Sequence, residues 1–163
     1  MADAPLCVRC SGSLPPGADY CPRCGVLLAP AHPACDLHPD REAAGVCVLC
    51  ERLLCGECAW RAGARSVCAA HAGVFFRGEW VEVFRSSEVA EADMARAVLE
   101  SEGCPVHTVD FGPVGYVWEG GGEHPLSRSA LNKPARVLVP IPEFLRAEKT
   151  LNEWRSAEAG SGE

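Results

Sequence analysis

The first half of the chain contains a series of cysteine and histidine pairs in which two other residues separate the paired side chains. The pairs are Cys7/Cys10, Cys21/Cys24, Cys35/His38, Cys47/Cys50, Cys55/Cys58 and Cys68/His71. A two-residue spacing lets a tight turn direct both side chains at one metal ion, and thiolate and imidazole donors suit zinc. Because structural zinc takes four such donors, these residues predict three zinc ions.

Two other uses of paired cysteines fit the sequence less well. Disulfides form in oxidising compartments, and residues 1–5 (Met-Ala-Asp-Ala-Pro) have neither the basic start nor the apolar run of an export signal. Redox chemistry predicts a single Cys-x-x-Cys motif beside a βαβ unit, not a series of pairs that includes histidines. The pattern therefore favours structural metal sites.

The segment from Cys35 to His71 holds four of the pairs within 37 residues. Below ~40 residues a hydrophobic core rarely maintains a fold alone, so we expect bound metal to supply the folding energy here. Spacing leaves two ligand pairings open. In the consecutive pairing, the first pair shares an ion with the second and the third with the fourth. In the interleaved pairing, the first pair shares an ion with the third and the second with the fourth.

The spacing Cys35-x2-His38-x8-Cys47-x2-Cys50-x4-Cys55-x2-Cys58-x9-Cys68-x2-His71 resembles that of B-box-type zinc fingers. The resemblance implies the interleaved cross-brace of that family. One zinc would then bind Cys35, His38, Cys55 and Cys58, and the other Cys47, Cys50, Cys68 and His71. The family usually ends with two histidines after a shorter gap, so this chain departs from it at Cys68 and His71.

Two further knuckles lie upstream, Cys7-Val-Arg-Cys10 and Cys21-Pro-Arg-Cys24-Gly25. In the second, proline fixes the turn and glycine can adopt the left-handed conformation that directs backbone N–H groups toward the sulfurs. The knuckles resemble the zinc ribbons at the ends of many bacterial proteins, which implies a zinc site made of four cysteines. A rubredoxin-type iron site uses the same motif, but the ten residues between these knuckles leave no room for its intervening sheet.

Residues 26–34 connect the two zinc modules and contain two prolines. Proline spacing predicts a semi-rigid linker that holds the modules apart. His32 stands shortly before Cys35 at a ligand-like spacing, and we expect it to be a solvated linker histidine.

The chain of 163 residues is net acidic, with 22 Asp and Glu against 15 Lys and Arg. Residues 1–73 have six arginines, seven acidic residues and no lysine. Ten thiolates with three divalent zinc ions would make this part more negative, which argues against nucleic-acid binding. No run approaches the ~20 apolar residues of a membrane helix, and unoxidised cysteines fit a reducing compartment. We expect a soluble cytoplasmic protein.

After His71 the pattern becomes that of a conventional folded domain. Residues 79–85 alternate polar and apolar side chains like a half-buried strand. The helix expected next starts at Ser86-Ser87, ends at Gly103 and buries Val89, Ala92, Ala95, Val98 and Leu99. The remaining elements are a strand over 104–111, a loop over 112–135, a strand over 136–140 and a helix from Pro142 that buries Phe144, Ala147, Leu151 and Trp154. This β-α-β-β-α order predicts a small α+β domain.

Residues 83–86, 100–106 and 137–140 resemble segments of a bacterial family described as prokaryotic signal-transducing proteins. The resemblance covers roughly residues 80–154. It implies a ferredoxin-like fold, distantly related to the nitrogen-regulatory PII proteins, in which the long loop contacts partners. Cys104 stands where that family has an apolar residue, so we expect it to be buried.

Four parts follow from these patterns: a zinc ribbon over 1–30, a B-box-like finger over 33–73, an α+β domain over 79–156 and a flexible tail over 157–163. We expect no catalysis, because all three zinc sites have four protein ligands and are closed. His107, Asp110 and His124 could converge under the long loop, but three polar residues near a loop are typical of a solvated surface.

The sequence favours a non-enzymatic adaptor or regulatory protein that binds a protein partner, with signal transduction as the process it would serve. Trp60 beside Arg61 could anchor that partner, although packing over a zinc knuckle is the more common role for such a tryptophan. One alternative is nucleic-acid binding, with Arg9 and Arg23 at the knuckle tips near phosphate. A zinc or redox sensor is the other.

Overall fold

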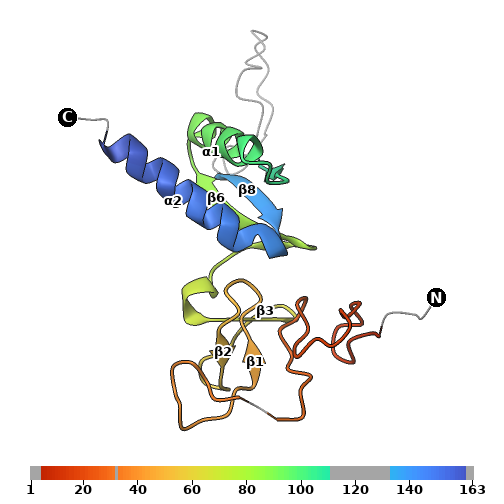
Figure 1. Cartoon of the computed structure of the whole chain (residues 1–163). Coiled ribbons are helices and arrows are strands. Elements are labelled where there is room, and N and C mark those ends of the chain that lie inside the picture. The colour runs from red at the N-terminus through yellow and green to blue at the C-terminus, as the bar shows by residue number, and fades with distance from the viewer. Residues whose placement is uncertain (1–4, 32, 111–132, 161–163) are drawn as a thin grey trace, which may run out of the picture. The chain divides into compact units, whose positions relative to one another are not determined.

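The computed structural model describes residues 5–31, 33–110 and 133–160, and the chain divides into two compact units, Met1–Glu79 and Trp80–Glu163 (Figure 1). His32, the tail residues 161–163 and residues 111–132, which include His124 and most of the expected long loop, lie outside the described residues.

The first unit is built from short hairpins joined by turns. β1 (Gly45–Val46) pairs antiparallel with β2 (Leu53–Leu54), and β3 (Trp60–Ala62) pairs antiparallel with β4 (Arg65–Val67). A 3-10 turn, η1 (Ala69–His71), and the short strand β5 (Phe76–Arg77) complete it. The buried apolar side chains are few, chiefly Val46, Val48, Leu49, Leu54 and Val67 together with the cysteines. A core this small cannot supply much hydrophobic stabilisation.

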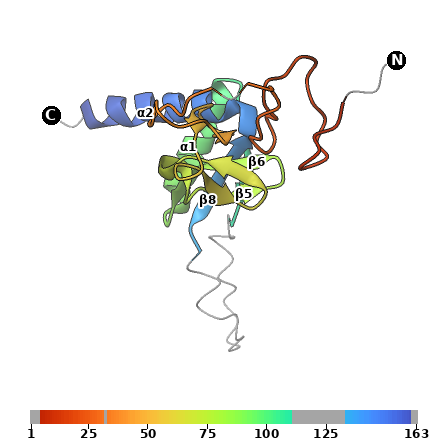
Figure 2. The same cartoon turned by 90° about the horizontal axis from the view of Figure 1, so that it is seen from below.

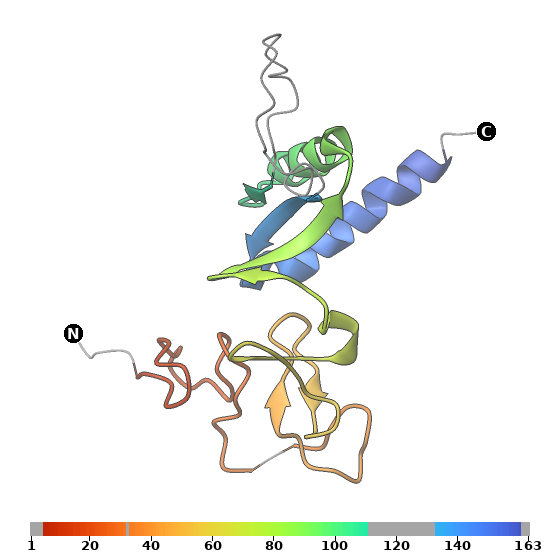
Figure 3. The same cartoon turned by 180° about the vertical axis from the view of Figure 1, so that it is seen from behind.

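The first metal module (residues 5–30) and the second metal module (residues 33–73) pack directly against each other (Figure 3). The backbone N–H of Val46 donates to the carbonyl oxygen of Gly25 at 2.7 Å, and that of Ser66 donates to the carbonyl oxygen of Cys24 at 3.0 Å. The expectation that a proline-spaced linker holds the modules apart is therefore wrong. Backbone hydrogen bonding between distant segments leaves no signature in residue spacing.

The second unit has the predicted element order, β6 (Trp80–Ser86), α1 (Val89–Ser101), β7 (His107–Val109), β8 (Ala135–Pro140), the 3-10 turn η2 (Ile141–Glu143) and α2 (Phe144–Gly160). β8 lies between β6 and β7, and both pairings are antiparallel. The register of β6 against β8 shifts between Glu82 and Phe84, so Val83 forms a bulge. Both helices contact β6 and β8 and lie on one side of the strands (Figure 2).

The helix ends follow from local sequence. Glu88 is the N-cap residue of α1, and its backbone N–H donates to the Ser86 Oγ at 3.0 Å, so Ser86 assists the start of the helix without being its cap. Gly103 follows the helix with a φ of 75°, which favours glycine. α2 continues to Gly160, so residues 157–160 extend the helix and do not belong to the tail expected from the sequence.

Most residues of the predicted buried stripes form the core of the second unit, while Val89, Val98 and Trp154 are only half-buried. Ala92, Ala95 and Leu99 of α1 and Phe144, Ala147 and Leu151 of α2 are buried. They cover strand residues from both central strands, namely Val81, Phe84, Ala135, Val137 and Val139. Cys104 is 3% exposed, as expected for a cysteine that packs as a small apolar residue.

Leu99 offers a test of this core. Leu99→Ala should destabilise the second unit by about 2–5 kcal/mol, because it removes a fully buried side chain and leaves a cavity. Met94→Ala on the same helix is the control, since Met94 is 51% exposed and its loss should change stability by less than ~0.5 kcal/mol. Urea unfolding of both variants measures the difference, and equal midpoints would contradict this packing.

Candidate metal centre

The paired residues gather into three groups of four. Tetrad A is Cys7, Cys10, Cys21 and Cys24; tetrad B is Cys35, His38, Cys55 and Cys58; tetrad C is Cys47, Cys50, Cys68 and His71. Within each tetrad all four donor atoms lie within 4.8 Å of one another. Tetrads B and C are interleaved along the chain, so the consecutive pairing that spacing left open does not occur.

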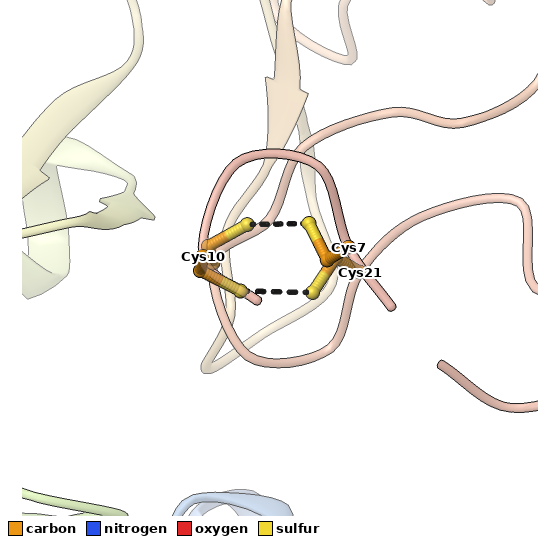
Figure 4. Close-up of side chains that lie close together, drawn as sticks. Cys7, Cys10 and Cys21 are labelled. Atoms are coloured by element: carbon orange, nitrogen blue, oxygen red, sulfur yellow. Dashed lines mark hydrogen bonds between the residues drawn. The ribbon is translucent and has the colours of Figure 1, made fainter. Parts of the chain in front are cut away.

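The shorter sulfur-to-sulfur separations match the edges of a tetrahedron around one ion. In tetrad A, Cys7 Sγ lies 3.7 Å from Cys24 Sγ, and Cys10 Sγ lies 3.7 Å from Cys21 Sγ (Figure 4). Four sulfurs at ~2.3 Å from a zinc ion would be about 3.8 Å apart. A disulfide would instead bring two sulfurs to about 2.0 Å. These cysteines are free thiols spaced to share an ion.

The two histidines face their tetrads through Nδ1. His38 Nδ1 lies 3.2 Å from Cys58 Sγ and 3.6 Å from Cys55 Sγ, while His71 Nδ1 lies 3.2 Å from Cys68 Sγ and 3.5 Å from Cys47 Sγ. A zinc ion with Zn–S of ~2.3 Å and Zn–N of ~2.0 Å gives sulfur-to-nitrogen edges of about 3.5 Å. Hydrogen bonding to the thiol of Cys35, and next to that of Cys55, raises the pKa of His38.

Local backbone geometry produces the knuckles. In the first three Cys-x-x-Cys motifs, the N–H of the residue after the pair donates to the carbonyl oxygen of the first cysteine at 2.8–2.9 Å. These following residues are Ser11, Gly25 and Glu51, with φ values of 55°, 75° and 59°. The sequence indicates this conformation only at Gly25, because glycine is the residue type that readily adopts a positive φ.

At Cys35 and Cys7 the first ligand of the pair is prepared to be a thiolate, whereas at Cys21 burial raises the pKa. Burial raises the pKa of the Cys35 thiol, but hydrogen bonds from backbone N–H groups, led by that of Leu37, outweigh burial and lower the pKa to about 6. At Cys7 burial likewise raises the pKa, and N–H groups led by that of Arg9 bring it down to about 7. The backbone N–H groups of the turn point their positive ends at the sulfur and so stabilise its negatively charged thiolate form.

The second cysteine has the opposite tendency. Burial, with the neighbouring thiols, raises the pKa of Cys24 to about 12, that of Cys50 to about 12 and that of Cys58 to about 11. Several thiolates at these distances repel one another in the absence of a cation. A divalent ion at the centre would remove that repulsion. The donor sets fit zinc, and the all-sulfur set of tetrad A also suits iron.

The other candidate residues are placed elsewhere. Cys104 lies in the second unit, where burial raises the pKa of its thiol. The His107 ring lies against that of Trp80 in a tilted arrangement with centroids 5.5 Å apart, and an Asp110 carboxylate oxygen lies 3.9 Å from Arg136 Nε. His107 and Asp110 therefore each have an aromatic or ionic neighbour within the second unit.

Trp60, for which the sequence left open packing over a zinc knuckle or contact with a partner, is among the exposed large apolar residues. Its side chain is 54% exposed at the start of β3. Arg61 beside it donates to the Ser66 hydroxyl at 3.5 Å. Pairing of Trp60 with Val67 across β3 and β4 fixes the backbone of a tryptophan that is more than half exposed.

Comparison of the chain with protein-family models, curated proteins and solved structures finds no match. Among residues 5–31, 33–110 and 133–160, no helix is long and apolar enough to cross a membrane. The assignment of the three tetrads accordingly depends on their donor geometry.

Metal content tests the tetrads. We expect three zinc ions per chain, two in Cys24→Ser, and three in the control Cys104→Ala, whose altered cysteine lies outside the tetrads. Chelation of the zinc should unfold the first unit and leave the second folded, because only the second has a substantial apolar core. Elemental mass spectrometry gives the metal count, and amide hydrogen exchange follows the two units. Full protection of the first unit in chelator would contradict this.

Acidification should release the zinc. Cys35 has a pKa of about 6 when folded against an ordinary value of 9.0, so its contribution to stability is complete above pH 9 and is lost as the pH falls through 6. Protons also compete with the metal at every other thiolate, so release should be steep between about pH 7 and pH 5. A chromophoric chelator measures it, and zinc retained at about pH 4 would be inconsistent with these sites.

Proposed function

We propose that this protein is a non-enzymatic, zinc-binding adaptor whose metal-held surfaces dock a protein partner. Tetrads A, B and C would each hold one zinc ion. The observation that carries the proposal is that each tetrad offers four protein donor atoms that all lie within 4.8 Å of one another. An ion held in this way has no open position for water or substrate, so it fixes structure and does not catalyse.

The exposed apolar side chains of the first unit support docking. Large apolar residues are usually buried, yet Leu6, Val8, Leu37 and Trp60 are 65%, 96%, 55% and 54% exposed. Each lies within two residues of a tetrad ligand. Val8 is between Cys7 and Cys10, and Leu37 immediately precedes His38. Zinc would hold these side chains in fixed positions without burying them, and a rigid exposed tryptophan is a typical interface anchor.

The second unit supports a regulatory role in the same proposal. The strands of this unit have the order β6-β8-β7 within a four-stranded sheet whose other edge is β5, and both helices lie on one side. This order is compatible with a ferredoxin-like fold that lacks its last strand. That arrangement agrees with the resemblance to bacterial signal-transducing proteins seen in residues 80–154. A cytoplasmic adaptor that joins a zinc-held docking unit to such a domain is the function we favour.

Nucleic-acid binding receives less support. Arg23 Nε lies 2.8 Å from a Glu79 carboxylate oxygen, so this arginine is already paired. Zinc-bound thiolates would add negative charge around it. Binding to the phosphates of nucleic acid requires clustered lysine and arginine side chains that are not already paired with acidic groups.

Trp60→Ala tests the docking proposal. The zinc-loaded protein should capture a partner from cell lysate, and Trp60→Ala should weaken its binding to the purified partner by about 2 kcal/mol or more, roughly 30-fold. Met94→Ala is the control, because Met94 is similarly exposed but lies in the second unit. Cys55→Ser/Cys58→Ser should also lose the partner.

Two results would count against the proposal. One is equal partner binding by the wild type, Trp60→Ala and Cys55→Ser/Cys58→Ser. The other is a gel shift with nucleic acid whose affinity falls steeply with salt, which would favour the alternative function.

A further inference from the structure

Three hydrogen bonds join the second knuckle of tetrad A to the second metal module. Two run between backbones, from Val46 N–H to the Gly25 carbonyl at 2.7 Å and from Ser66 N–H to the Cys24 carbonyl at 3.0 Å. In the third, the Tyr20 hydroxyl donates to a Glu51 carboxylate oxygen at 2.9 Å. The contacts therefore start from both ends of one knuckle.

Each of these contacts ends beside a ligand of tetrad C. Val46 immediately precedes Cys47, Glu51 immediately follows Cys50, and Ser66 lies two residues before Cys68. On the other side, Tyr20 precedes Cys21, and Gly25 follows Cys24. The backbone that shapes one metal site thus hydrogen-bonds to the backbone that shapes another.

The contact surface is closely fitted around Gly25. A Cβ atom at Gly25 would lie 2.1 Å from the carbonyl oxygen of Val46, and one at Gly45 would lie 2.9 Å from the carbonyl oxygen of Gly25. Ser66 is 2% exposed, and its carbonyl accepts from the N–H of Val48 at 3.0 Å. Such a surface forms only when both segments have their folded backbone conformations.

We propose that tetrads A and C bind zinc cooperatively, with Gly25 and Ser66 as positioning residues that couple them. An ion in tetrad A fixes the knuckle from Cys21 to Cys24, and the fixed knuckle holds Val46 and Ser66 in the conformation that tetrad C requires. By linkage, an ion in tetrad C strengthens tetrad A by the same factor. The inference goes beyond the docking role and depends on the proposed zinc binding.

The experiment measures zinc occupancy of each tetrad separately. Protein is equilibrated at a series of free zinc concentrations set by a competing chelator, then alkylated, and the protected cysteines are identified by peptide mass mapping. Protection of Cys47, Cys50 and Cys68 reports tetrad C, and protection of Cys35, Cys55 and Cys58 reports tetrad B.

The first variant, Cys7→Ser/Cys10→Ser, empties tetrad A through its first knuckle, which takes no part in the three hydrogen bonds to the second metal module. We expect the zinc affinity of tetrad C to fall by about 5- to 150-fold, the usual range of coupling between sites, and that of tetrad B to fall less. Unchanged affinity at tetrad C would overturn the proposal. So would an equal loss at B and C, which would indicate general unfolding of the module.

The second variant, Gly25→Ala, keeps every ligand and disrupts the contact surface. It should weaken tetrad C, and adding Cys7→Ser/Cys10→Ser to it should weaken tetrad C little further, because the coupling is already lost. Gly17→Ala is the matched control: Gly17 has a φ of 71° like the 75° of Gly25, but no atom lies near its Cβ position. The proposal would be overturned if Gly25→Ala and Cys7→Ser/Cys10→Ser lowered the zinc affinity of tetrad C by fully additive amounts. It would also be overturned if Gly17→Ala lowered that affinity as much as Gly25→Ala does.

The wild type separates this inference from the proposed function. If the wild type protects none of the three tetrads, both fail. If it protects all three and tetrad C does not respond to the loss of tetrad A, zinc binding stands and only the coupling is excluded.

Discussion

Electrostatic repulsion among crowded thiolates is the constraint on which the first unit depends. Folding brings ten sulfurs to three points, with nearest sulfur contacts of 3.7–3.8 Å where two cysteines meet. Backbone N–H groups lower the pKa of the leading cysteine of tetrads A and B, but burial and the other thiols raise the pKa of Cys24, Cys50 and Cys58 to about 11 or 12. The knuckles alone therefore cannot hold all their sulfurs ionised, whereas a central divalent cation can. Because thiolates need a cation and protons compete with it, the folding of this unit should depend on bound metal and on pH.

A unit held in this way does not need to bury its apolar side chains. Trp60 and Leu37 can remain exposed because the ligands beside them, and not an apolar core, fix the backbone. The second unit is organised differently, by two helices whose apolar stripes cover the strands β6 and β8. Cysteine itself has different roles in the two units. The cysteines of the tetrads are candidate metal ligands, whereas Cys104 of the second unit is buried as a small apolar side chain. The exposed apolar side chains next to tetrad ligands are the features on which the proposed docking role relies.

The contact between the two metal modules makes the first unit more than a series of independent fingers. Cys24 and Gly25 place their carbonyl groups against Ser66 and Val46, so the backbone near one tetrad restricts the backbone near another. Gly25 serves both needs: its positive φ closes the knuckle, and its missing side chain admits the Val46 carbonyl. A single glycine then joins metal-site geometry to module packing.

The sequence by itself determined which residues could be ligands, because a two-residue spacing acts within one turn. It also determined the order of elements after Trp80 and their buried stripes, since helix and strand periodicities are local. Tertiary structure alone decided that Cys35 and His38 face Cys55 and Cys58, a choice that spacing left open and only resemblance suggested. It decided as well that Trp60 is exposed and that the modules touch. These features depend on segments far apart in the chain and on backbone groups that every residue carries, so no pattern of side chains records them.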